Sequence, residues 1–285
     1  MEQIFINSLI SGSFYALFAM SFNLLLGTVK FFDVSFGARA VLGAYLVVLF
    51  AKILGWPLGI SIFLGICGAI FLGIISEKFI FSRLREKKAS NLVLLIASFG
   101  AFISVQAILA MSFSSQFQTI SLDSLSGTLA LGSGNITLLQ IIFIVLVPII
   151  FFFLWLFLKK TDTGRTIRAV GDNEEMSKVM GINSGRVILL VFIITSALAS
   201  LGGIAGLLDI GIDPSSGLKI VLKTIVASII GGVGSMAGGF LGGYILGGVE
   251  NIAAWELGSE WQDAVAFLLL IIFLIFRPRG IMGKK

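Results

Sequence analysis

The chain has 285 residues, of which 57% are hydrophobic and 12% are charged, and its mean hydropathy is +1.07. A soluble surface needs far more charge, so this composition excludes a soluble domain and predicts a protein that crosses a membrane several times. The net charge of +5 would suggest nucleic acid in a soluble protein. Basic cytoplasmic loops explain it here, and we expect no nucleic-acid partner.

Nine apolar segments follow one another along the chain. A helix needs roughly 20 apolar residues to cross a bilayer core of about 30 Å. We expect spans at about 4–27, 36–54, 57–76, 92–113, 138–158, 187–208, 217–233, 236–254 and 260–277. The first has no basic leader before it, so it is predicted as a span and not as a cleaved signal. The expected fold is all-α and polytopic, with about 8–9 segments in a single transmembrane domain over residues 1–285.

The first two connections and the first spans carry charges near their predicted ends. Side chains such as Asp33, Arg39 and Lys52 can reach the interface, so no catalytic constellation is evident. A charge at membrane depth tends to face a cavity or a partner charge. We therefore expect Asp33, Ser35 and Lys223 to border a solute path. The alternative is that Asp33 and Lys223 serve structure or helix ends, with Asp33 paired to Lys30 or Arg39.

One long polar segment, residues 159–186, separates the fifth and sixth spans. Asp172 can cap a helix that has Glu174 and Glu175 in its first turn, and Gly181 can end it. We expect a short cytoplasmic helix that acts as a docking surface. A solvated loop that only orients the protein is the alternative.

The seventh and eighth spans are short and rich in glycine, and the sequence GGVGSMAGG joins them. Glycine lets helices approach closely, and membranes tolerate interrupted helices where these pack on protein or line a cavity. The segment therefore predicts either tight packing alone or a packed wall that also bounds a substrate path. Leu42 to Leu46 also resembles Leu241 to Ile245, as in the repeats of many transporters.

The lysines and arginines predict the topology. Of the 20 cations, 17 fall on one side of the membrane if the N-terminus lies outside and the C-terminus inside. They are Lys30, Arg39, Lys78, Arg83, Arg85, Lys87, Lys88, Lys159, Lys160, Arg165, Arg168, Lys178, Arg186, Arg277, Arg279, Lys284 and Lys285. The opposite loops, 114–137 and 255–259, contain none.

Several kinds of chemistry have no carrier in the sequence. There is no histidine, and Cys67 is the single cysteine, which leaves no disulfide and no paired-thiol chemistry. No phosphate-binding loop, nucleophile elbow or spaced metal-ligand motif occurs. We expect a protein that is not an enzyme and that has no cofactor or metal site.

Four stretches give the chain a family resemblance. They are GTVKFFDVSFGARAVLGAY from Gly27, RAVGDNEEMSKVMGIN from Arg168 with Arg186-Val187 after it, Pro214 with Lys223 and the glycine pairs from Gly231 to Glu250, and RPRGI from Arg277. In this order and spacing they resemble the smaller of the two permease types in ATP-binding-cassette (ABC) importers for branched-chain amino acids. The chain departs from the family pattern at Asp33, Phe36, Met176, Ser177 and Ala237.

The resemblance implies the membrane permease subunit of an ATP-driven importer in a prokaryotic cell membrane. Its partners would be two ATPase subunits, a second related permease, an external solute-binding protein and the lipid bilayer. A permease for urea or short amides remains an alternative, as do an ion-driven secondary transporter and a membrane scaffold or enzyme. The residues implied in ATPase coupling are Gly164, Arg165, Arg168, Ala169, Gly181, Ile182 and Asn183, and helical spacing adds Met176, Val179 and Met180 as apolar anchors.

Overall fold

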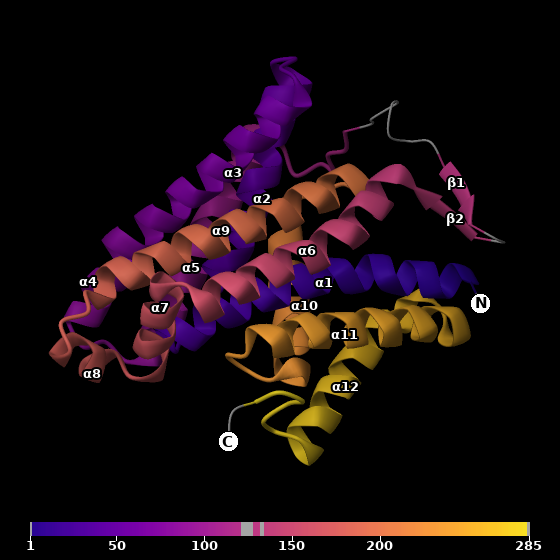
Figure 1. The fold of residues 1–285 in the computed structure, drawn as a ribbon. Helices are drawn as coiled ribbons and strands as arrows, with labels where there is room; N and C mark the ends of the chain where they lie inside the picture. The colour runs from indigo at the N-terminus through magenta and orange to yellow at the C-terminus, as the bar shows by residue number, and fades with distance from the viewer. Residues whose placement is uncertain (1, 121–127, 132–133, 284–285) are drawn as a thin grey trace. The chain divides into compact units, whose positions relative to one another are not determined.

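The computed structural model describes residues 2–120, 128–131 and 134–283. Within these residues, seven helices are long and apolar enough to cross a membrane (Figure 1). They are α1 (Glu2–Val29), α2 (Ser35–Val47) with the π-helix η1 (Val48–Ile53), α3 (Leu58–Ile75) with the π-helix η2 (Ser76–Phe81) and α4 (Ser82–Glu86), α5 (Asn91–Phe113), α6 (Leu138–Lys160), α9 (Ser184–Asp209), and η3 (Ser259–Trp261) with α12 (Gln262–Phe276). The expected all-α, polytopic fold is confirmed.

Two predicted boundaries need correction. The third span was expected to end near residue 76, but its helix continues through η2 and α4 to Glu86. Hydropathy marks where a helix leaves the apolar core, and it does not mark where the helix ends. The loop expected at 114–137 contains a two-stranded antiparallel hairpin, β1 (Thr128–Leu131) and β2 (Gly134–Thr137), with Thr128 opposite Thr137.

The predicted seventh and eighth spans form a bent pair. Helices α10 (Ser216–Gly231) and α11 (Met236–Leu257) meet at an angle of 112°. Three contacts join the two helices. Far from the break, Lys223 pairs with Glu250; nearer to it, Ala227 contacts Gly242; and next to it, Gly231 contacts Gly238. Partners that converge in this way define a hairpin. Nine separate crossings are therefore not present: among the described residues, seven helices are long and apolar enough to cross a membrane, or eight if the bent pair counts as one, which is the lower end of the expected 8–9 segments.

The chain divides into two compact units. Unit 1 comprises residues 1–23, 121–155 and 222–285, and unit 2 comprises 24–120 and 156–221. In unit 2, α2 is almost fully buried and packs against α3, α5 and α9. A Cβ atom at Gly203 of α9 would lie 2.1 Å from the carbonyl oxygen of Ala40. Glycine at this position is therefore what lets α9 and α2 touch through their backbones.

Unit 1 is built around the contact between α1 and α11. Gly247 and Gly243 of α11 press on the backbone of α1 at Gly12 and Ala16. The partners run in opposite directions along the two helices, so α1 and α11 are antiparallel. The predicted tight packing of the glycine-rich segment is confirmed. Near the closed end of the hairpin, Ile281 and Met282 donate backbone hydrogen bonds of 3.0 and 2.8 Å to the carbonyl oxygens of Ile230 and Gly231.

Candidate functional site

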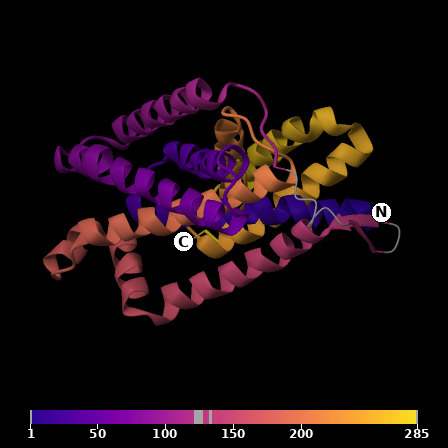
Figure 2. The same ribbon diagram turned by 90° about the horizontal axis from the view of Figure 1, so that it is seen from above.

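The polar segment begins with a helix that the sequence reading missed. Helix α7 (Asp162–Asp172) starts at Thr161, whose hydroxyl accepts a 3.0 Å hydrogen bond from the Gly164 amide. Figure 2 shows the sharp turn from α6 into α7. A Cβ atom at Gly164 would lie 2.4 Å from the Phe157 carbonyl oxygen, so only glycine permits this turn. The threonine cap and Asp162 in the first turn are typical start signals, but Gly164 and Gly171 obscured them.

Helix α7 is amphipathic and packs on α9 within unit 2. Ile167 and Val170 are buried, whereas Arg168 is exposed and Ala169 is half-buried. Arg165 is also exposed, and its guanidinium lies 2.9 Å from the carboxylate of Asp162. The arginines of this helix therefore point away from the protein, where a partner can reach them.

The predicted short helix is present as α8 (Glu174–Val179). Its cap was assigned to the wrong residue: Asn173, and not Asp172, accepts the Met176 amide at 2.9 Å. Asp172 ends α7 instead. The predicted end is confirmed, because Gly181 has a φ of +83°, which favours glycine. Ile182 then donates a hydrogen bond of 3.0 Å back to the carbonyl of Ser177.

Three apolar side chains project from α8 and its end. Met176, Val179 and Met180 are 60%, 82% and 76% exposed. They follow i, i+3, i+4 spacing, so they share one face of the helical turn. Unlike the lipid-facing residues of the spans, they lie in a polar segment. Exposed apolar groups in such a setting mark a contact surface.

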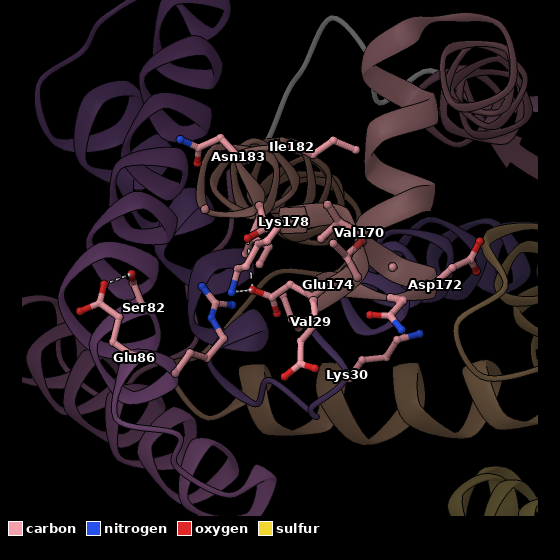
Figure 3. A pocket seen from close by; sticks show the side chains of 18 of the residues that line it. Val29, Lys30, Ser82, Glu86, Val170, Asp172, Glu174, Lys178, Ile182 and Asn183 are labelled. Carbon is pink, nitrogen blue, oxygen red and sulfur yellow. Dashed lines mark hydrogen bonds and ion pairs between the residues drawn. The ribbon is translucent and has the colours of Figure 1, made fainter. Parts of the chain in front are cut away.

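Beside α8 lies a pocket of about 1040 Å³, formed entirely within unit 2 (Figure 3). The end of α1 and the turn from α4 to α5 supply Lys30, Arg85 and Lys88, and the turn from α7 to α8 supplies Asp172, Glu174 and Glu175. Gly181, Ile182 and Asn183 complete the lining. The pocket therefore brings predicted coupling residues together with cations of the second connection.

Glu174 ties the turn between α7 and α9 together. Its carboxylate lies 2.8 Å from Lys178 Nζ and accepts a 3.3 Å hydrogen bond from the Ser184 hydroxyl. Burial alone would raise the pKa of Glu174, but the hydrogen bond and charge of Lys178, the charge of Arg85 and the Ser184 hydroxyl together lower it. Glu174 is therefore held in its charged form at neutral pH.

In unit 2, the structure places Asp33 and Ser35 at the buried start of α2. One oxygen of Asp33 accepts hydrogen bonds from the Ser35 amide at 2.9 Å and the Ser35 hydroxyl at 2.5 Å. The other oxygen pairs with Arg39, whose side chain is fully buried. Arg39 also donates to Ser196 at 3.2 Å, and its guanidinium lies 5.1 Å from the Phe192 ring. Lys30 and Arg39 were both possible partners of Asp33, and the structure shows an ion pair with Arg39.

In unit 1, Lys223 lies between two carboxylates. Its ammonium is 2.5 Å from Glu250 and 2.6 Å from Asp263. The second oxygen of Glu250 accepts a 2.7 Å hydrogen bond from the Tyr15 hydroxyl. This group holds α1, α10, α11 and α12 at the open end of the hairpin. Among the described residues, no cluster of His, Cys, Asp and Glu side chains could hold a metal ion.

A family profile described as branched-chain amino acid transport system / permease component matches residues 4–274, nearly the whole chain. The chain belongs to this permease family. BraD of Pseudomonas aeruginosa, a high-affinity branched-chain amino acid transport system permease protein, is 31% identical over 99% of this chain and 95% of its own length. LivH of Escherichia coli K12, named in the same way, is 30% identical over 100% and 96%.

The fold of this permease also has a likeness among solved structures. The structure titled PsaBC from Streptococcus pneumoniae in complex with Fab aligns with 97% of this chain and 92% of its own, with a TM-score of 0.55. At 15% identity, this likeness concerns the fold alone. The family makes the chain a multi-pass membrane transport subunit and not an enzyme, and it implies an ATPase and a solute-binding protein as partners.

The permease contains one more buried ion pair, which the sequence analysis missed. Glu77 of η2 is turned inward and pairs with Arg85 of α4, eight residues later. Glu77 Oε2 and Arg85 Nη1 are buried without a hydrogen-bond partner. In a regular α-helix, residues eight apart are more than two turns apart, so their pairing was not expected from spacing. The only signal in the sequence was an acid near the predicted end of a span.

Proposed function

We propose that this permease is the membrane-spanning subunit of an ATP-driven importer for branched-chain or other small amino acids. In this proposal two ATPase subunits, a second related permease and an external solute-binding protein assemble with a single transmembrane domain. The solute class follows from the names of BraD and LivH, which match this chain over almost its whole length. ATP hydrolysis belongs to the partner chains.

The exposed apolar trio of α8 carries the assignment of the ATPase contact. Met176, Val179 and Met180 are the apolar anchors that a cleft on a partner would take. The other coupling residues lie in α7, at the end of α8 and before α9: Gly164, Arg165, Arg168, Ala169, Gly181, Ile182 and Asn183. We infer that α7 and α8 together form the coupling surface, at the rim of the pocket.

We also infer that Asp33, Ser35 and Lys223 border the solute path. All three are positioned by ion pairs or hydrogen bonds, and Asp33 and Ser35 are buried. An amino acid carries a carboxylate and an ammonium, so its passage requires compensating charges and helix ends. Uptake by Asp33→Asn and Lys223→Met, with matched expression and ATPase rate, tests this role. Unchanged affinity and specificity in both would remove them from the path.

The coupling surface is tested by replacing its apolar anchors. Each docked apolar side chain contributes about 1.5–3 kcal/mol, so Val179→Ser with Met180→Ser should weaken ATPase binding by about a hundredfold or more. The measurements are co-purification of the ATPase and leucine uptake in proteoliposomes. Urea uptake is measured in the same proteoliposomes to distinguish the two solute classes. Arg168→Glu and Gly181→Val should uncouple ATP hydrolysis from uptake while membrane insertion stays normal.

Lys160→Gln, an exposed change at the end of α6 and outside the pocket, is the matched control. Normal binding and uptake in all the anchor and coupling variants would overturn the assignment of this surface. Uptake of urea in preference to leucine would overturn the solute class and leave the surface in place.

A further inference from the structure

One face of the third span combines an apolar row with cations at its end. Every fourth residue from Phe63 to Lys87 lies on this row, and six of the seven are exposed. The row consists of Phe63, Cys67, Phe71, Ile75, Phe79, Arg83 and Lys87, of which Ile75 is half-buried. Phe63, Phe71 and Phe79 are 65%, 64% and 54% exposed. Residues four apart are neighbours on a helix, so the row is continuous.

The length of this helix places the cations at the membrane surface. From Leu58 to Glu86 it has 29 residues, which corresponds to about 43 Å at about 1.5 Å per residue. The hydrocarbon core takes about 30 Å of that length. The last two to three turns, from about Lys78 onward, therefore lie at the depth of the lipid headgroups.

The acids of the same segment are directed away from the row. Glu77 is buried against Arg85, and Glu86 lines the pocket and accepts a hydrogen bond of 3.3 Å from the Ser82 hydroxyl. Within the described residues, Lys78, Arg83 and Lys87 are exposed and form no ion pair. The Arg83 guanidinium lies 5.4 Å from the centre of the Phe79 ring, so it bends back toward the apolar part of the row.

We propose that this row, from Phe63 to Lys87 with Lys78 beside it, binds an anionic phospholipid. The acyl chain lies along the phenylalanines, and the phosphate is held by Arg83, Lys87 and Lys78. The positive-inside rule accounts for cations in this connection. It does not account for cations that end an exposed aromatic row while Glu77 turns inward to Arg85 and Glu86 lines the pocket. Clusters of lysine and arginine next to a span bind anionic headgroups, at about 1 kcal/mol each.

The test uses the full-length permease in nanodiscs that contain equal amounts of phosphatidylglycerol and phosphatidylcholine. Native mass spectrometry after delipidation counts the lipids that remain bound. We expect wild-type protein to retain phosphatidylglycerol preferentially and to lose this preference as salt is raised. Arg83→Gln with Lys87→Gln should reduce the preference by about fivefold per cation removed. Lys219→Gln, an exposed lysine of α10, is the control and should change nothing.

Three results would overturn the proposal. The first is equal retention of phosphatidylglycerol by the wild-type and the double variant. The second is displacement of the lipid by glycerol 3-phosphate at the same concentration, because the acyl chains would then contribute nothing. The third is a double variant that keeps its lipid but loses the ATPase, which would make the cations a protein contact. The salt dependence of the wild-type protein decides the matter even if the double variant does not fold.

Discussion

At the scale of single residues, the pair of Asp33 and Arg39 shows how a membrane protein keeps charges inside. Each group is fully covered, and neither could stay charged there alone. The guanidinium has one carboxylate, one serine and two aromatic rings around it, while its Nε has no hydrogen-bond partner. The pair fixes the start of α2, the most buried helix of unit 2.

Removing one partner of this pair should cost more than neutralising it conservatively. Arg39→Met leaves the Asp33 carboxylate buried and unpaired, at a cost of about 3–5 kcal/mol. Asp33→Asn keeps one oxygen, which can still accept either the two hydrogen bonds of Ser35 or the one of Arg39, so it should cost less than Arg39→Met. Thermal unfolding of the purified variants measures both. Equal losses of stability would mean that the ion pair does not organise the start of α2.

The residues that the sequence analysis singled out differ in how far they could be foreseen. Gly181 was recognisable because a left-handed turn after a helix needs a residue without a side chain. Gly164 was predicted only through the family resemblance. Its position requires glycine because the turn from α6 into α7 brings it against the carbonyl oxygen of Phe157, and this contact cannot be seen in the sequence. Glu77 and Arg85 could not be paired from sequence, since the π-helix between them changes the register.

At the scale of elements, the bend between α10 and α11 is held by a side chain from α1. The Asn23 amide donates to the carbonyl oxygens of Gly232 and Ser235 at 3.2 and 2.9 Å, and its oxygen accepts the Gly234 amide at 3.2 Å. Gly232 and Gly234 both have positive φ. A broken helix exposes backbone groups that lipid cannot satisfy, and Asn23 supplies the missing partners.

Asn23→Leu should therefore open the closed end of the hairpin. Three backbone groups at the bend lose their partners, and the buried carbonyl of Gly232 alone should cost about 1–3 kcal/mol. Hydrogen exchange at residues 230–236 should rise relative to the rest of unit 1, and the melting temperature should fall. Asn7→Leu, an exposed change on the same helix, is the control. Unchanged exchange in Asn23→Leu would mean that the bend is held by packing alone.

The elements themselves followed from the sequence to a large extent. Apart from the end of the third, the strongly apolar spans were placed within a few residues of the helices, because a run of about twenty apolar residues is best buried as a helix that crosses the membrane. The hairpin was not predicted. Glycine spacing reveals that two segments pack closely, but the direction of the chain after a break depends on contacts such as Ala227 with Gly242.

At the scale of the whole molecule, the hairpin of α10 and α11 shows which helix ends of unit 1 lie on the same side. Asn23 of α1 touches Ser235, and the residues after α12 touch Ile230 and Gly231. Asn23 and the end of α12 therefore lie at the same end of unit 1, and the start of α1 lies at the opposite end. With the positive-inside rule, this supports an N-terminus outside and a C-terminus inside.

Cysteine labelling can test this topology, including the return of the hairpin. In a Cys67→Ser background, Ser115→Cys and Ser259→Cys should react with an impermeant thiol reagent added to whole cells. Glu175→Cys should react only after permeabilisation. All three positions are exposed. Protection of Ser259→Cys together with labelling of Ser115→Cys would mean that α10 and α11 cross the membrane as one span.

The contact of Ile281 and Met282 with the end of α10 has a consequence for biosynthesis. These residues leave the ribosome after α11 and α12, and they complete the hydrogen bonding of α10, which is made before both. Unit 1 also needs α1, which is made earlier still. The closure of unit 1 therefore waits until residue 282 has left the ribosome, and any fusion or substitution nearby must leave residues 280–282 free to dock.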